Sequence, residues 1–226
     1  MSWLTTNIKE RFSNAADFEF YFVGNVDEKL IEDFSAKYIA SLPSTGRKEK
    51  VVDLGYRMLK GDLKKVVNKG TDPKSTVSIM YYGDTKYSPK EAIAIKALGE
   101  VLTIKLTEEL RENESGVYGV SARGSMNKVP YGSYNFMIGF PCAPENTETL
   151  IASALKEVQK IIDNDPEAKD VVKFKEAELL EYRKDSKENK FWLDNFTKSF
   201  TDSISPDEVL QTEEKINSIT AKDIQN

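Results

Sequence analysis

A long stripe of apolar residues is the feature that most constrains how this chain can fold. The stripe recurs at steps of three and four residues, as one face of a helix does: Ile95, Leu98, Leu102, Leu106 and Leu110. Ser88 and Pro89 precede it in the positions of a helix cap and a first turn, and Glu91 completes a capping-box pattern. The pattern predicts a helix that packs on a sheet or on other helices.

Short runs rich in β-branched and aromatic residues are predicted to form strands on both sides of this helix. They cover residues 18–23, 61–69, 76–82, 117–125 and 133–140. The run at 18–23 reads FEFYFV and ends at a Gly-Asn turn.

Further helices are predicted from apolar residues that repeat every three or four positions. One follows residue 26 with the stripe Leu30, Phe34, Tyr38 and Leu42, and another covers 147–162 with the stripe Ile151, Leu155, Val158 and Ile162. The chain after residue 162 is predicted to be mostly helical, and Asp165-Pro166 has the pattern that begins a helix. The order predicts an α+β fold, with a mixed or antiparallel sheet and helices on one side. We expect a single domain over 1–226 with a helical C-terminal subregion from about residue 147.

The residues that the chain lacks exclude several kinds of site. It has 226 residues with no histidine, and Cys142 is the one cysteine. A His-based zinc site, a Ser-His-Asp triad and a Cys-His dyad are therefore excluded on this chain, so we expect no metal site of the zinc-hydrolase kind. Carboxylates alone remain able to hold magnesium or calcium, but no EF-hand spacing is present. The net charge of -5 argues against nucleic-acid binding, and no apolar run approaches the ~20 residues of a membrane span.

The stretch LRENESGVYGVSARG, residues 110–124, holds the candidate site residues Arg111 and Tyr118. In one interpretation Arg111 is a cation that ends a helix, and Tyr118 is an ordinary strand residue. In the other, both side chains point into one cleft, where a phenol can donate to an oxyanion and a guanidinium can hold a carbonyl or carboxylate. Gly116 would let the backbone pass close by.

Two long stretches of this chain resemble a known family. RFSNAADFEFYFVGNVDEKLIEDFSAKYIASLP is similar to the entry strand and helix of a pitrilysin/insulinase-like (inverzincin) zinc metallopeptidase half-domain. LTEELRENESGVYGVSARGSMNKVPYGSYNFMIGFPCAPENTETLIASAL is similar to the later part of that unit, and the resemblance covers roughly residues 8–200. Since the chain cannot carry the zinc motif H-x-x-E-H, it resembles the non-catalytic, C-terminal-type half of the pitrilysin/processing-peptidase fold.

The resemblance implies that this half closes a proteolytic chamber against a zinc-bearing homologous half. It implies that Tyr118 is a catalytic oxyanion donor in trans to the zinc half, and that Arg111 and Tyr118 bind substrate. The cofactor implied is zinc on the partner half, with none on this chain. The implied partners are that half, in the same polypeptide or as a separate subunit, and a peptide substrate, with no nucleic acid and no membrane span.

Two other functions stay open at this point. One is a purely structural or interaction subunit of the same fold with no role in turnover, and the other is an unrelated α+β binding module. By itself the chain is not expected to be an enzyme, whereas its parent protein or complex is expected to be a zinc metalloendopeptidase. The residues leave both a periplasmic and a cytoplasmic bacterial location open, and they do not identify the substrate or the oligomeric state.

Overall fold

In the computed structural model, which describes residues 3–226, the chain divides into two units. One unit joins the described residues up to Val52 to Lys184–Val209, and the other joins Asp53–Arg183 to Leu210–Asn226. The larger unit contains the sheet and carries both candidate residues, Arg111 and Tyr118.

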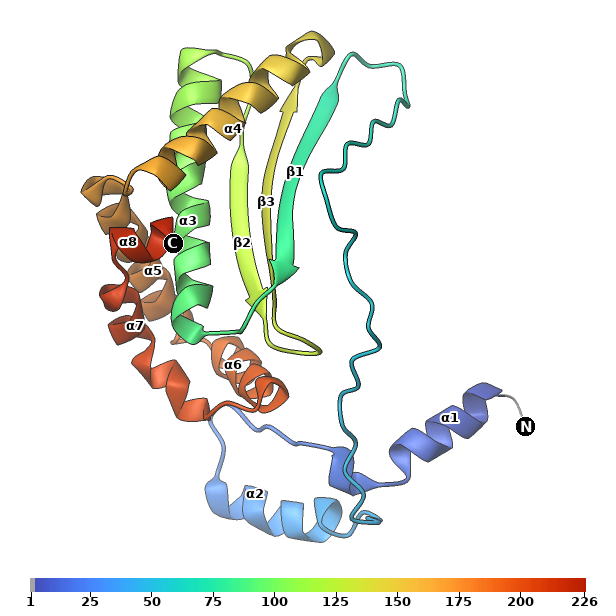
Figure 1. Cartoon of the computed structure of the whole chain (residues 1–226). Helices are drawn as coiled ribbons and strands as arrows, with labels where there is room; N and C mark the ends of the chain where they lie inside the picture. The colour runs from blue at the N-terminus through green and yellow to red at the C-terminus, as the bar shows by residue number, and fades with distance from the viewer. Residues whose placement is uncertain (1–2) are drawn as a thin grey trace. The chain divides into compact units, whose positions relative to one another are not determined.

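Three antiparallel strands form the sheet, in the order β1-β3-β2 (Figure 1). They are β1 Ser75–Asp84, β2 Ser121–Asn127 and β3 Ser133–Cys142. In the central rows of the register, Ile79 and Ala122 both lie opposite Ile138. The predicted strands at 76–82 and 133–140 are therefore confirmed. The strand predicted at 117–125 begins at Ser121, and Val117 makes an isolated bridge with Cys142.

The long helix α3, Pro89–Leu106, packs against β2 and continues as the π-helical segment η3, Thr107–Asn113. Its predicted start is confirmed, because Ser88 Oγ accepts a hydrogen bond from the Glu91 amide at 3.4 Å and Pro89 occupies the first turn. At Gly99 an added Cβ would lie 2.9 Å from the Ala122 carbonyl oxygen. The helix thus approaches β2 more closely than a side chain at that position would permit.

The remaining helices of this unit extend the layer that α3 begins. They are η4 Pro144–Asn146, α4 Thr147–Asp163, α5 Ala168–Asp185, α7 Thr212–Ser218 and α8 Ala221–Gln225, with η5 Pro206–Gln211 leading into α7. One face of the sheet is buried through Phe136, Ile138 and Phe140, whereas Met80 and Met137 on the other face are exposed. The expected α+β fold with helices on one side of an antiparallel sheet is confirmed.

The smaller unit is helical in its regular structure. It contains α1 Trp3–Phe12, η1 Ala15–Asp17, α2 Glu28–Phe34, the π-helical η2 Ser35–Ile39 and α6 Asn189–Asp202. The predicted helix after residue 26 is confirmed, and the Asp27 side chain caps it by accepting from the Leu30 amide at 3.0 Å. Its apolar stripe remains largely exposed.

Two predicted strands are wrong, because residues 18–23 and 61–69 pair with no strand in the part of the chain that the structure describes. Both runs have the composition of strands, but a strand exists only with a hydrogen-bonded neighbour. The helix predicted at 147–162 is confirmed as α4, yet its buried face is shifted by one residue. Leu150 and Ile161 are buried, while Leu155 and Ile162 are exposed.

None of the helices within residues 3–226 combines the length and the hydropathy that crossing a membrane requires.

Candidate functional site

Arg111 lies in the π-helical segment η3, directly after Leu110. Leu110 is fully buried, whereas the Arg111 side chain is more than half exposed. Its Nε lies 3.6 Å from Glu112 Oε1, so a neighbouring carboxylate balances part of its charge. π-helical turns interrupt the regular spacing of side chains and are frequent at functional sites. Here Leu110, the residue directly before the arginine, is buried in the core and so anchors this segment.

The loop from η3 to Tyr118 is fixed by contacts with the core. The Gly116 amide donates to the Leu110 carbonyl oxygen at 2.9 Å, and a Cβ on Gly116 would lie 2.5 Å from Leu150 Cδ2. Ser115 has a φ of 52°, a conformation that non-glycine residues adopt only when their surroundings enforce it. Val117 is buried and bridges to Cys142. The backbone on the amino side of Tyr118 is therefore held in place.

Tyr118 itself projects from this fixed loop with 97% of its surface exposed. Among residues 3–226, no hydrogen bond or ion pair joins its phenol to Arg111. Both side chains lie on the same connection between α3 and β2, and both are available to a molecule outside this chain. A phenol that is free to donate and a guanidinium with five N–H groups can together bind a carbonyl oxygen or a carboxylate.

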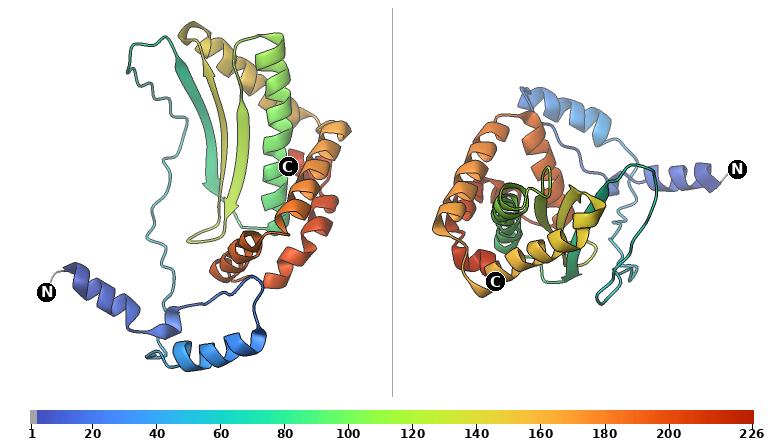
Figure 2. Two further views of the ribbon diagram at one scale, coloured as in Figure 1. Left: turned by 180° about the vertical axis from the view of Figure 1, so that it is seen from behind. Right: turned by 90° about the horizontal axis from the view of Figure 1, so that it is seen from above.

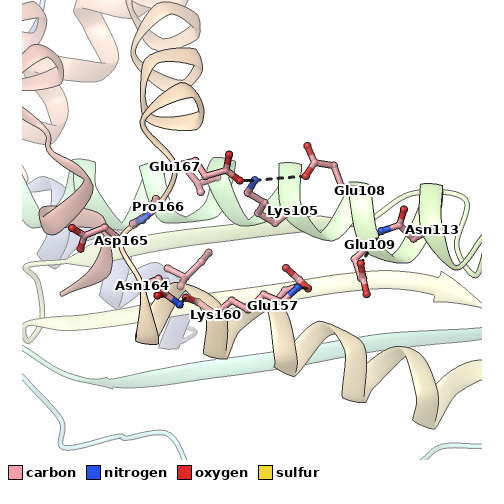
Figure 3. A pocket seen from close by; sticks show the side chains of 12 residues that line it. Lys105, Glu108, Glu109, Asn113, Glu157, Lys160, Asn164, Asp165, Pro166 and Glu167 are labelled. Carbon is pink, nitrogen blue, oxygen red and sulfur yellow. Dashed lines mark hydrogen bonds and ion pairs between the residues drawn. The ribbon is translucent and has the colours of Figure 1, made fainter.

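A charged pocket of about 370 Å³ lies beside η3, between α3 and α4. Figure 3 shows its side chains, which come from α3, η3, α4 and the link to α5. It is lined by Val101, Lys105, Glu108, Glu109, Asn113, Glu157, Lys160, Ile161, Asn164, Asp165, Pro166 and Glu167.

Lys105 is the cation at the centre of this charged cluster. Its ammonium bonds to Glu167, lies 3.0 Å from Oδ2 of Asp170 and lies 3.6 Å from Oε2 of Glu108. Burial lowers the pKa of Lys105, but the hydrogen bond to Glu167 and the ion pair with Asp170 outweigh it, so the pKa is raised. The bond from Lys105 lowers the pKa of Glu167 to about 2, with a further contribution from Lys169. Asp170 is fully buried, so this cluster ties α3 to α5 through a buried charge.

Sequence reasoning did not identify this cluster. Lys105 lies on the polar side of the apolar stripe, and Asp170 follows 65 residues later. The fold alone brings them together. A usable signal was present in the clustered acidic residues of 165–170, but similar charge runs are common on solvated helix faces.

The donor set of the described residues does not fit a zinc site. Structural and catalytic zinc is held by three or four ligands drawn from Cys, His, Asp and Glu. The chain has no histidine, and residues 3–226 contain no group of three or more such side chains placed to hold a metal ion.

Comparisons with known proteins agree with the fold. A probable zinc protease PqqL of Haemophilus influenzae is 23% identical over 149 residues, which is 66% of this chain and 16% of that protein. The periplasmic protease PqqL from Escherichia coli has a similar structure, with a TM-score of 0.74 and 19% identity over 89% of this chain and 22% of that one. A protease from Helicobacter pylori matches 90% of this chain and 49% of its own, with a TM-score of 0.68 and 15% identity.

The chain thus spans about a sixth of the curated relatives that it matches. The model of the peptidase M16 inactive domain matches residues 4–178, a range that includes Arg111 and Tyr118. Because the match covers most of the chain, this protein belongs to the peptidase M16 inactive-domain family and is homologous to the inactive half of the insulinase-like zinc proteases.

Proposed function

We propose that this chain is the non-catalytic half of a zinc metalloendopeptidase, which closes the proteolytic chamber and contributes contacts to substrate at a zinc site on a partner half. The observation that carries the proposal is the position of Arg111 and Tyr118. Within a domain of this family, both side chains are exposed on a loop that Leu110, Gly116 and Val117 fix to the core. A fixed loop with exposed polar side chains suits a site that meets a ligand from outside.

In this proposal Tyr118 donates a hydrogen bond to the oxygen of the scissile peptide carbonyl as negative charge develops on it. A preorganised donor stabilises that charge without having to reorient at the moment of reaction. Arg111 holds a second carbonyl or carboxylate of the substrate, because its guanidinium can donate two parallel bonds. The partner half would supply the zinc.

The test is turnover by the complete protease, with variants made in this half. Tyr118→Phe removes only the hydroxyl, and the ring is exposed, so we expect an unchanged melting temperature and a ~10²–10³-fold lower kcat. Tyr56→Phe is the matched control, because Tyr56 is also an exposed tyrosine and lies outside the loop. Turnover by Tyr118→Phe at the rate of the Tyr56→Phe control would contradict the catalytic role.

Arg111 is tested in the same protease. Arg111→Ala should raise KM or lower kcat, and Arg111→Lys should restore little, because a single ammonium does not reproduce two parallel bonds. The alternative is a purely structural half. It predicts that Arg111→Ala changes stability by ~0.3–1 kcal/mol, as loss of a helix-ending cation does, and leaves peptide hydrolysis unchanged.

A further inference from the structure

The pocket between α3 and α4 carries an excess of negative charge. The two helices lie side by side in the helical layer (Figure 2), and every residue that lines the pocket belongs to the larger unit. Two ammonium groups and five carboxylates line it, so negative charges exceed positive ones by three at neutral pH: Lys105, Lys160, Glu108, Glu109, Glu157, Asp165 and Glu167. A recess lined mainly by one sign of charge concentrates ions of the opposite sign.

Three of these carboxylates lie beside the cations of the pocket itself. Lys105 bonds to Glu167 and lies 3.6 Å from Oε2 of Glu108. Lys160 donates to Oε1 of Glu157 at 2.5 Å. Both ammonium groups are therefore committed to neighbouring carboxylates, and they do not pair with the remaining two.

The remaining carboxylates, those of Asp165 and Glu109, lie at opposite ends of the pocket (Figure 3). Within residues 3–226, no ion pair reaches either of them. Glu109 accepts a hydrogen bond from the side-chain amide of Asn113 at 2.9 Å, but that donor is neutral. Two negative charges separated by the length of the pocket are complementary to a molecule with a positive charge at each end.

Glu157 lies between these two ends and adds a buried acceptor that lacks a donor. Its side chain lines the pocket, although the residue is only 5% exposed. Lys160 bonds to its Oε1, whereas its Oε2 accepts no hydrogen bond within the part of the chain that the structure describes. Buried polar atoms rarely lack a partner. A donor inside the pocket would satisfy this oxygen.

The apolar part of the wall favours an organic cation over a metal ion. Val101, Ile161 and Pro166 line the pocket and are all buried. A magnesium or calcium ion needs about six converging oxygen ligands, and residues 3–226 contain no group of three or more acidic, cysteine or histidine side chains placed to hold one. A methylene chain gains by covering apolar surface, while its ammonium groups form charge-assisted hydrogen bonds with carboxylates.

We propose that this pocket binds a linear aliphatic triamine. Its two terminal ammonium groups pair with Asp165 and Glu109, and its inner ammonium donates to the free oxygen of Glu157. The methylenes lie against Val101 and Ile161. Three positive charges match the excess of three negative charges in the lining. The proposal uses neither Arg111 nor Tyr118, and it does not depend on the proposed function.

Calorimetric titration of the whole 226-residue chain at constant ionic strength tests the proposal, with spermidine as the probe. Spermidine should bind with one molecule per chain. Putrescine lacks one ammonium group and n-butylamine lacks two, so each step should weaken binding about tenfold. N8-acetylspermidine keeps the length and loses one terminal charge, and it should bind about tenfold more weakly than spermidine. Binding of n-butylamine as tight as that of spermidine, or no saturable binding of spermidine, would overturn the proposal.

Variants of the two end carboxylates test the site from the side of the protein. Asp165→Asn and Glu109→Gln keep the shape of each side chain and remove its charge, and each should weaken spermidine binding about tenfold. Glu145→Gln is the matched control, because Glu145 is an exposed carboxylate of η4 outside the pocket, and it should bind normally. Unchanged melting temperatures without ligand show that the variants are folded. Full affinity in the folded pocket variants, or an equal loss in the control, would contradict the site.

Magnesium provides the last control. Magnesium chloride should lower the affinity for spermidine no more than sodium chloride at the same ionic strength, because screening is then its only effect. A larger loss would mean that a metal ion occupies the pocket, and would overturn the proposal. None of these readouts uses turnover. The amine site can therefore fail while Tyr118→Phe still lowers kcat, and the reverse outcome is equally readable.

Discussion

At the scale of single residues, Gly116 brings the loop of Tyr118 into contact with the core. A Cβ at Gly116 would meet Leu150, which is buried, at 2.5 Å, whereas nothing lies within 4 Å of a Cβ at Gly119. Gly116→Ala should therefore destabilise the protein by ~1–3 kcal/mol through overpacking. Gly119→Ala, three residues further, should be nearly neutral. Denaturant unfolding of both variants tests this, and equal stability would show that the loop is not fixed at Gly116.

Lys105 is the residue whose loss should affect stability most among the charged ones. Removing its ammonium leaves Asp170 fully buried, with Lys173 at 3.8 Å as its nearest remaining cation. Lys105→Met should destabilise by about 3 kcal/mol, since an uncompensated buried charge is strongly unfavourable. Lys169→Met, which removes an exposed partner of Glu167, is the control and should change little. Adding Asp170→Asn to Lys105→Met should restore most of the loss. A Lys105→Met protein as stable as the control would contradict the role of the cluster.

The contact that a residue makes could be predicted from the sequence where its neighbours along the chain determine it. The cap at Ser88 follows from three neighbouring residues, and the structure shows it. The roles of Arg111 and Tyr118 remain predictions from their spacing and their family resemblance, although both side chains are exposed as such roles require. The contact between Lys105 and Asp170 was beyond local reasoning, because it depends on how α5 packs against α3.

At the scale of elements, helices were predicted more reliably than strands, for a physical reason. The hydrogen bonds of α3 and α4 are internal, so an apolar period and a capping residue suffice to locate them. A strand needs a partner, and residues 18–23 and 61–69 have strand composition without one among the described residues. The buried face of α4 was also misplaced. The predicted stripe followed the largest aliphatic residues, whereas packing buries Leu150, Ala154 and Glu157.

The face of α4 gives a direct comparison between two leucines on one helix. Leu150 is 1% exposed and Leu155 is 42% exposed. Leu150→Ala should cost ~2–5 kcal/mol, as expected for a fully buried leucine, and Leu155→Ala should cost clearly less. Thermal or denaturant unfolding measures both. If Leu155→Ala were the more destabilising change, the stripe Ile151–Leu155–Val158–Ile162 would be the packed face after all.

At the scale of the whole molecule, this chain holds part of what a protease of its family needs. It spans 16% of the curated relatives that it matches, and its family model is that of the inactive domain. The described residues offer a fixed loop with a phenol and a guanidinium. They offer no donor set for zinc. Substrate contacts and metal chemistry are thus expected on different halves.

This division predicts how the isolated chain behaves with metal. Tight zinc binding needs three or four nitrogen, sulfur or carboxylate ligands that converge, and a chain without histidine and with a single, buried cysteine cannot assemble the usual set. Tag-free protein dialysed after exposure to zinc should therefore retain far less than one zinc per chain, and it should not hydrolyse peptides. A mixture with the zinc-bearing half should bind one zinc and cleave. Stoichiometric zinc retained by the isolated chain would overturn the assignment of metal chemistry to the partner half, and cleavage by the partner half alone at the full rate would remove the need for this one.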